Sequence, residues 1–188
     1  MAAPKVELRP LRSDDRDRLL IWRNSPEVAR YMFTDHQISA AEHDHWFTGI
    51  EGDARRAYWI VNVDGAPAGL TNLYDIDRGS SCCAWAWYLA EPSVRGKGVG
   101  GCVGYLVIEK AFDEFGLGEL SCEVLASNHR ARRLYQKFGF REEAPPRRRV
   151  LKNGALEEVL ELGLRAQTWA AVRPQIHQGL RAAGFLDD

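Results

Sequence analysis

The chain has 188 residues, 45% of them hydrophobic, which excludes a disordered or collagenous protein and favours one domain with a short appendage. Its 25 Lys and Arg residues nearly balance its 26 Asp and Glu residues. The resulting formal charge of −1 argues against nucleic acid or an anionic membrane as the main partner. Any anionic ligand must therefore be bound by a few local groups.

Cysteine usage and hydropathy indicate where the protein works. Cys82, Cys83, Cys102 and Cys122 have no C-x-x-C spacing, so we interpret them as buried small side chains in a reducing compartment. The N-terminal segment lacks the apolar run of a signal peptide, and no segment approaches the roughly 20 apolar residues needed to cross a bilayer. We expect a cytoplasmic protein without a membrane partner.

The first fifty residues predict a strand followed by helices. Residues 6–11 form the strand, and Ser13, followed by acidic residues, caps a helix that ends near Asn24. A second helix is expected over 27–33. Ser39 and Glu42 have the spacing of a capping box before a helix that runs through Phe47.

The remainder of the chain alternates strands and helices. Asp64-Gly65 is a hairpin signal between apolar runs, and further turns are expected at 75–79, 147–149 and 153–154. The predicted strands are 56–63, 66–73, 81–89, 120–125, 140–143 and 157–164. The helices between them are expected from Val103 until Gly116 and over 128–138. This order predicts an α/β domain over residues 1–164 with a mixed, mostly antiparallel sheet flanked by helices.

Residues 165–188 form a tail with amphipathic helical spacing. Its apolar residues are Trp169, Val172, Ile176 and Leu180, and Pro174 interrupts the pattern. We expect a C-terminal helical appendage that packs on the domain or on a second copy of the chain in a homodimer.

A glycine-rich loop, Gly96-Lys97-Gly98-Val99-Gly100-Gly101, opens the helix after the third central strand. It matches G-x-G-x-x-G, but it does not follow its strand directly and antiparallel strands precede it, which excludes a Rossmann site. No glycine precedes Lys-Ser or Lys-Thr, which excludes a Walker loop. Successive glycines before a helix let backbone N–H groups approach an anion, and a diphosphate is the natural ligand.

Two motifs in this order resemble the GNAT superfamily of N-acetyltransferases. Arg95-Gly96-Lys97-Gly98-Val99-Gly100 has the pattern of its cofactor loop. Asn128-His129-Arg130-Ala131-Arg132-Arg133-Leu134-Tyr135, followed by Gly139-Phe140, has the pattern of its second motif. The resemblance covers roughly residues 5 to 164 and implies the GNAT fold, with a sheet that splays between its fourth and fifth strands.

The resemblance also implies the cofactor, acetyl-CoA, and the residues that bind it. The pyrophosphate lies on the loop amides, the pantetheine arm lies between the splayed strands, and Asn128 bonds to the arm. Arg130, Arg132 and Arg133 on the following helix are candidates for binding the phosphates at the nucleotide end. The alternative, for at least two of them, is a solvated basic helix face. The implied cofactor residues are Trp87, Tyr88, Leu89, Arg95, Gly96, Gly98, Val99, Gly100, Gly101, Asn128 and Arg130.

Two residues are predicted to carry the chemistry. The amine must lose a proton before it attacks a thioester, and Glu123, on the strand beside the pantetheine, is the expected base; the alternative is a surface carboxylate. Tyr135 is at the family's position for assisting the departing thiolate, and the alternative is a core tyrosine. Because a phenol pKa near 10 exceeds a thiol pKa near 8.5, Tyr135 should act mainly through a hydrogen bond.

The N-terminal helices carry the features that suggest an acceptor. Their sequence from Trp22 to Phe47 is similar to one branch of the superfamily, the N-acetyltransferases of pseudaminic acid biosynthesis, which act on a UDP-linked 4-amino-4,6-dideoxy sugar. On this hypothesis, the diphosphate is bound by Arg23 and His43, the apolar wall is formed by Met32, Phe33 and Trp46, and the amine proton is relayed by Thr71 or Asn72. Tyr74-Asp75 departs from the polar or basic residue expected near the diphosphate.

Other functions remain open at this stage. Acetyltransferases for protein N-termini or polyamines share the Arg-Asn-x-Pro helix in looser form, but a polyamine enzyme needs an acidic pocket. A cofactor-binding sensor without chemistry is the hypothesis outside enzymes. His43-x-His45 has no third ligand at a useful spacing, so no metal is predicted.

Overall fold

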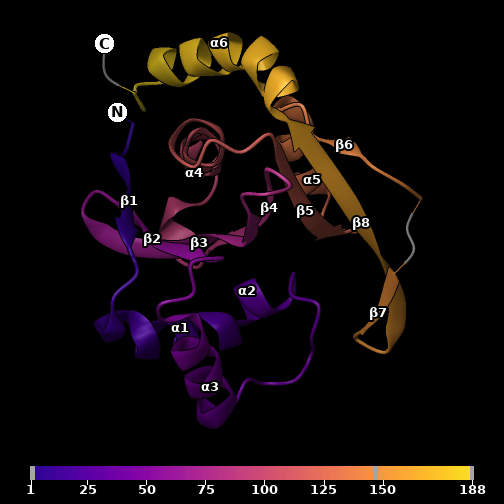
Figure 1. The fold of residues 1–188 in the computed structure, drawn as a ribbon. Helices are drawn as coiled ribbons and strands as arrows, with labels where there is room; N and C mark the ends of the chain where they lie inside the picture. The colour runs from indigo at the N-terminus through magenta and orange to yellow at the C-terminus, as the bar shows by residue number, and fades with distance from the viewer. Residues whose placement is uncertain (1–2, 146–147, 187–188) are drawn as a thin grey trace.

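The computed structural model describes residues 3–145 and 148–186 and places helices on both faces of a mixed sheet (Figure 1). The strands are β1 (Val6–Pro10), β2 (Ala57–Val63), β3 (Ala66–Asp77), β4 (Cys82–Leu89), β5 (Glu119–Leu125), β6 (Arg141–Glu142), β7 (Arg148–Lys152) and β8 (Ala155–Arg165). The α-helices are α1 (Arg16–Asn24), α2 (Pro26–Ala29), α3 (Ala40–Ile50), α4 (Val99–Glu109), α5 (His129–Lys137) and α6 (Ala166–Ala182). Short 3-10 turns are η1 (Ser13–Asp15) and η2 (Pro92–Val94), and the π-helical turn η3 (Lys110–Glu114) extends α4.

The sheet opens at its centre, as predicted. Its order is β1-β2-β3-β4-β5-β8-β6, with β7 paired to β8, and neighbouring strands are antiparallel except β4 and β5. The parallel register of β4 and β5 covers only Cys82–Ala84 opposite Glu119–Ser121. Beyond these residues the two strands separate, which confirms the GNAT fold with its splay between the fourth and fifth strands.

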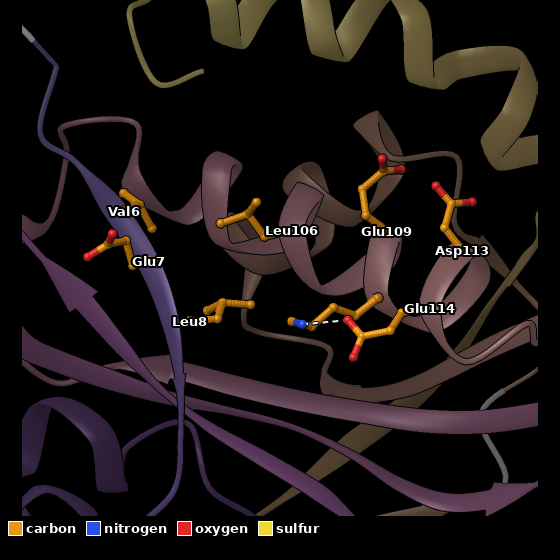
Figure 2. A pocket seen from close by; sticks show the side chains of 8 residues that line it. Val6, Glu7, Leu8, Leu106, Glu109, Asp113 and Glu114 are labelled. Atoms are coloured by element: carbon orange, nitrogen blue, oxygen red, sulfur yellow. Dashed lines mark hydrogen bonds and ion pairs between the residues drawn. The ribbon is translucent and has the colours of Figure 1, made fainter. Parts of the chain in front are cut away.

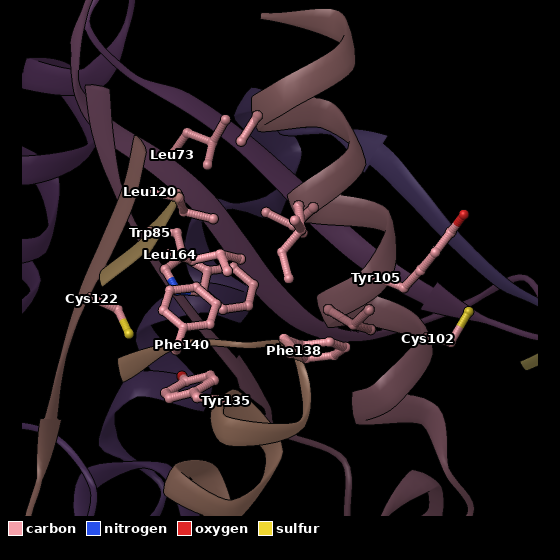
Figure 3. Close-up of a cluster of buried hydrophobic side chains, with 14 of the residues drawn as sticks. Leu73, Trp85, Cys102, Tyr105, Leu120, Cys122, Tyr135, Phe138, Phe140 and Leu164 are labelled. Carbon is pink, nitrogen blue, oxygen red and sulfur yellow. The ribbon is translucent and has the colours of Figure 1, made fainter. Parts of the chain in front are cut away.

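Apolar side chains form a core on each face of the sheet. The larger core joins the sheet to α4, α5 and α6 and contains Trp85, Phe138 and Phe140 (Figure 3). The smaller core joins α1, α2 and α3 to the other face and includes Trp22 and Phe47. The separated ends of β4 and β5 lie between α1–α3 on one side and α4–α6 on the other (Figure 1).

Several local predictions are confirmed. Ser39 and Glu42 form the expected capping box at the start of α3. Asp64 and Gly65 adopt φ values of 51° and 79°, as a two-residue hairpin turn requires. The cysteines are free, and Cys83, Cys102 and Cys122 are buried as predicted, whereas Cys82 is only partly buried.

The first helices depart from the prediction in two places. Ser13 is not the cap, because η1 begins at Ser13 and Asp15 Oδ2 accepts the Arg12 N–H at 3.0 Å. The helix predicted over 27–33 ends at Ala29. Its terminal carbonyl, that of Ala29, accepts the Met32 N–H at 3.0 Å in a tighter turn and also a tertiary bond from Lys152 Nζ at 2.9 Å.

The later elements bring three corrections. β3 continues to Asp77 through the region predicted as a turn. Residues 148 and 149, also predicted as a turn, begin β7, which forms a hairpin with β8; residue 147 lies outside the described part of the chain. Pro174 does not interrupt the tail, because α6 runs through it to Ala182.

The tail helix packs on the same domain rather than standing apart from it. Trp169 is buried and its indole donates to Glu109 on α4 at 2.9 Å, while Arg173 pairs with both Glu109 and Asp113. Figure 2 shows these carboxylates on the side of α4 and η3 that faces α6, above a groove beside β1. None of the helices in the described ranges is long and apolar enough to span a membrane.

Candidate functional site

A cavity of about 780 Å³ occupies the cleft between the separated ends of β4 and β5. Its walls come from the glycine loop, α5, α6 and the segment that follows α2. This size lies within the range of small-molecule sites. The predicted loop residues, the β4 residues Trp87 to Leu89, Glu123 and Tyr135 all line it.

The glycine loop is held in the shape that the sequence predicts. Gly98 precedes α4 with φ of +84°, a conformation that favours glycine. Arg95 braces the loop by donating from Nη2 to the carbonyls of Leu89 and Ala90 at 2.9 and 3.1 Å. A Cβ atom at Gly100 would lie 3.1 Å from Cη2 of Trp87, so a side chain here would press on the Trp87 ring and require it to shift.

Helix α5 contributes polar and basic groups to the same cavity. Asn128 caps the helix, with its Oδ1 accepting the Ala131 N–H at 3.2 Å, so its amide NH₂ is the group left to meet a ligand. Arg130 and Arg133 line the cavity, whereas Arg132 donates to the carbonyl of Ala126. The arginine run therefore divides between ligand-facing and structural roles.

Tyr135 lies at the base of the cavity in an apolar environment. Its ring packs against Trp85 and Phe140 at centroid distances of 5.5 and 5.6 Å, with the hydroxyl directed toward the strand of Cys122 (Figure 3). Burial raises the pKa of Tyr135 well above its usual value, and the nearby indole N–H of Trp87 opposes the shift without forming a well-aligned hydrogen bond. Tyr135 is therefore a neutral hydrogen-bond donor at physiological pH.

Glu123 faces the cavity from β5, but it is not a free carboxylate. Nη1 of Arg148, on β7, lies 3.0 and 2.9 Å from its two oxygens. The guanidinium also lies 4.9 Å from the ring centroid of Phe33. Glu123 therefore belongs to a small cluster that joins β5, β7 and the segment after α2.

The structure brings only part of the predicted acceptor set to the cavity. Met32 and Phe33 line it. His43 does not: it is 4% exposed, its Nε2 lies 2.8 Å from the Arg16 carbonyl, and it stacks on Trp46. Thr71 is fully buried, with its hydroxyl 3.4 Å from the Ala86 carbonyl. These contacts make His43 and Thr71 packing residues that do not face the cavity.

Three other predicted acceptor residues lie around the cavity rather than in it. Arg23 is half-buried, and its Nη2 donates to the hydroxyl of Thr34 at 2.6 Å. Burial lowers the pKa of Arg23. Asn72 is the cross-strand partner of Ala86, which lines the cavity, and Trp46 packs edge-on against Tyr58.

Sequence reasoning missed several residues of the site. Arg30 and Tyr31 line the cavity beside Met32, and Ile176 and Leu180 line it from the tail. The apolar spacing of the tail was visible in the sequence, but nothing in that spacing indicated which surface α6 would cover. Arg148 stands in an arginine run that was interpreted as a turn.

Comparisons with known proteins agree with this geometry. The acetyltransferase (GNAT) domain family matches residues 5–141. The chain is 29% identical to the acetyltransferase PseH of Campylobacter jejuni over 130 residues, which cover 69% of this chain and 79% of the relative. It is 25% identical to the spermidine N(1)-acetyltransferase of Escherichia coli over 161 residues, 86% of each chain.

Solved structures show the same fold. The spermidine N-acetyltransferase of Vibrio cholerae, in complex with CoA and spermine, superposes with a TM-score of 0.81 at 20% identity, covering 88% of this chain and 98% of that one. The family match spans the glycine loop, the α5 motif and the splayed strands that form the cavity. The chain therefore belongs to the GNAT acetyltransferase family, and it is an acetyl-CoA-dependent N-acetyltransferase.

Proposed function

We propose that this protein acetylates the 4-amino group of a UDP-linked 4-amino-4,6-dideoxy sugar, a reaction of pseudaminic acid biosynthesis. The observation that carries the proposal is at the acceptor end of the cavity, where the charge of the Glu123 carboxylate is already balanced by Arg148. The basic side chains of the cavity wall are Arg30, Arg95, Arg130, Arg133 and Lys137, and its acidic ones, among the described residues, are Glu27 and Glu123. A wall with this excess of cations suits anionic ligands although the chain as a whole carries a charge of −1.

The cavity fits acetyl-CoA, which supplies the thioester whose acetyl group is transferred. The glycine loop lines the cavity where it enters the N-terminus of α4, and the first N–H groups of that helix are the ones that a pyrophosphate would bind. Arg130, Arg133 and Lys137 are the cations for the remaining phosphate groups.

The acceptor end of the cavity argues against a polyamine. A polyamine is a polycation and needs several uncompensated carboxylates, but Arg148 already balances the charge of Glu123. The Glu123 oxygens keep lone pairs that can still accept one proton. Glu27 precedes the cation of Arg30 by one helical turn. Met32 and Phe33 present an apolar surface that suits the methyl group of a 6-deoxy sugar. The relatives themselves do not separate the two acceptors, since they include both PseH and spermidine acetyltransferases.

Glu123 and Tyr135 act at different steps of the reaction. Glu123 receives the proton of the acceptor ammonium, directly or through water, which leaves a neutral amine for attack on the carbonyl carbon. The new C–N bond forms as the C–S bond breaks, and the second proton of the attacking nitrogen passes to the departing thiolate, directly or through solvent, to give the amide and the free thiol. Tyr135, kept protonated by its apolar surroundings, donates a hydrogen bond to the leaving sulfur and disperses its negative charge.

Replacing Glu123 with glutamine should lower kcat/KM by about 100-fold. The defect should be largest at low pH, where the acceptor amine is protonated, and should shrink as pH rises and the free amine appears without a base. The pH profile of kcat/KM measures this. Glu158→Gln is the matched control, because Glu158 is an exposed carboxylate paired with Arg149 outside the cavity. A wild-type profile for Glu123→Gln would assign the proton to another group.

Replacing Arg23 with alanine should raise KM for the sugar nucleotide about tenfold or more, because charge-assisted hydrogen bonds are worth about 1.5–3 kcal/mol each. Acetyl-CoA affinity should not change. Arg23 is not in the cavity wall but interacts electrostatically with Tyr88, which lines it. Arg18→Ala serves as control, since this neighbour on α1 pairs instead with Asp15 at 3.6 Å. A lower melting temperature with an unchanged KM would make Arg23 a purely structural residue.

One assay tests the proposed acceptor. Thiol release from acetyl-CoA is measured with a UDP-linked 4-amino-4,6-dideoxy sugar, with spermidine and with a peptide bearing a free N-terminus. We expect kcat/KM to be highest for the sugar nucleotide and to fall with salt, because the ligand is anionic. Preference for spermidine or for the peptide would contradict the proposal and favour the corresponding branch of the family.

A further inference from the structure

Lys152, at the end of β7, is a buried lysine whose ammonium group is fully engaged. It is 7% exposed, and its Nζ lies 2.9 Å from the Ala29 carbonyl, 3.3 Å from the Thr34 carbonyl and 2.6 Å from Oδ1 of Asp35. An ammonium group has three N–H donors, and three acceptors surround this one. Lys152 therefore joins the β7–β8 hairpin to both ends of the segment after α2.

The segment that Lys152 joins is the acceptor side of the cavity wall. Residues 30–35 form neither helix nor strand, and Arg30, Tyr31, Met32 and Phe33 line the cavity. Backbone hydrogen bonds to the preceding helix reach the first part of this segment, from the N–H groups of Arg30, Tyr31 and Met32. The placement of the wall thus depends on side chains from elsewhere in the fold.

Further contacts from the same hairpin meet this segment. The N–H of Asn153 donates to Oδ2 of Asp35 at 2.6 Å, so both carboxylate oxygens of Asp35 face the hairpin. Arg148, at the other end of β7, stacks on Phe33 while it binds Glu123. The hydrogen bond from Lys152 to Asp35 lowers the pKa of that carboxyl, which keeps the ion pair charged at neutral pH.

We propose that Lys152 is a positioning residue for the acceptor amine. It contacts neither reactant itself; it fixes residues 30–35, and with them the surface that meets the acceptor. The inference rests on the proposed function only in assigning this end of the cavity to the acceptor. The cofactor end, formed by the glycine loop and α5, shares no contact with Lys152 in the described structure.

Lys152→Met tests the inference, since methionine keeps most of the apolar stem and removes the ammonium group. We expect KM for the acceptor to rise about tenfold, with Kd for acetyl-CoA and kcat changed by less than twofold. Amide hydrogen exchange over residues 29–35 should accelerate even without any acceptor present. Arg149→Met is the matched control: it removes a cation from the same strand, whose partner is Glu158 and not the segment.

A second variant keeps the test independent of folding. Asp35→Asn removes the charge of the exposed partner and should raise the acceptor KM and the exchange rate in the same direction, and the double variant should be less than additive. Unchanged exchange, an unchanged acceptor KM, or equal losses for both substrates would overturn the inference.

The acceptor itself is tested separately from Lys152. Both the UDP-linked 4-amino sugar and spermidine are assayed with the unaltered protein first. Failure of that protein to acetylate the sugar nucleotide contradicts the proposed function. The KM of Lys152→Met is then measured with whichever amine the unaltered protein acetylates. A KM for that amine well above the KM of the Arg149→Met control supports the inference, and equal KM values overturn it.

Discussion

Replacing Gly100 with valine is expected to raise the Kd for acetyl-CoA by about 100-fold or more. The added Cβ would lie 3.1 Å from Cη2 of Trp87, and the two methyl groups beyond it would press further into the cavity. Overpacking costs about 1–3 kcal/mol. Each charged hydrogen bond lost from the loop amides costs about 1.5–3 kcal/mol more. Isothermal titration calorimetry measures the change directly.

A matched variant separates loss of the site from a general effect of valine. Gly49 is exposed on α3, and an added Cβ there meets no atom within 4 Å. Gly49→Val should bind acetyl-CoA as the unaltered protein does. Calorimetry that gives equal affinities for Gly100→Val and Gly49→Val would show that the loop does not hold the cofactor.

Tyr135→Phe is expected to lower kcat by about 10- to 150-fold while the Kd for acetyl-CoA stays the same. The expected loss corresponds to one charge-assisted hydrogen bond of about 1.5–3 kcal/mol to the leaving sulfur. Phenylalanine keeps the ring contacts with Trp85 and Phe140, so the fold should be retained. Single-turnover kinetics with saturating acetyl-CoA isolate this step.

Tyr105→Phe is the control for Tyr135. Tyr105 is also a buried tyrosine, but it lies on α4 outside the cavity wall, and its hydroxyl donates to Glu109 at 3.2 Å. Its removal should change stability and leave kcat alone. If Tyr135→Phe behaves like Tyr105→Phe, the hydroxyl at 135 is a core group without a part in the reaction.

The cofactor side of the site was predictable because its determinants are local. Gly98 needs a positive φ, Gly100 needs space beside a strand, and Asn128 caps the helix that it precedes. Each of these requirements depends on residues close in sequence or on one neighbouring strand. The spacing of these residues in the sequence was therefore enough to predict the cofactor side of the site.

The acceptor side was less predictable because distant contacts build it. The segment 30–35 owes its position to Lys152 and Arg148, more than 110 residues away in the chain. β7 itself escaped prediction because its sequence, RRVLK, has too few apolar residues to indicate a strand, although the Asn153-Gly154 turn after it was recognised. His43 looked like a ligand from its residue type, and only its bond to the Arg16 carbonyl reveals a packing role.

The position of α6 links the tail to ligand affinity. Ile176, Gly179 and Leu180 form part of the cavity wall, while Trp169 and Arg173 hold the same helix to α4 and η3. A ligand that gains free energy by touching α6 must stabilise the docked helix by the same amount, because the two equilibria share one thermodynamic cycle. Substitutions at Trp169 or Arg173, far from any reacting atom, would thus appear in a binding isotherm as weaker affinity.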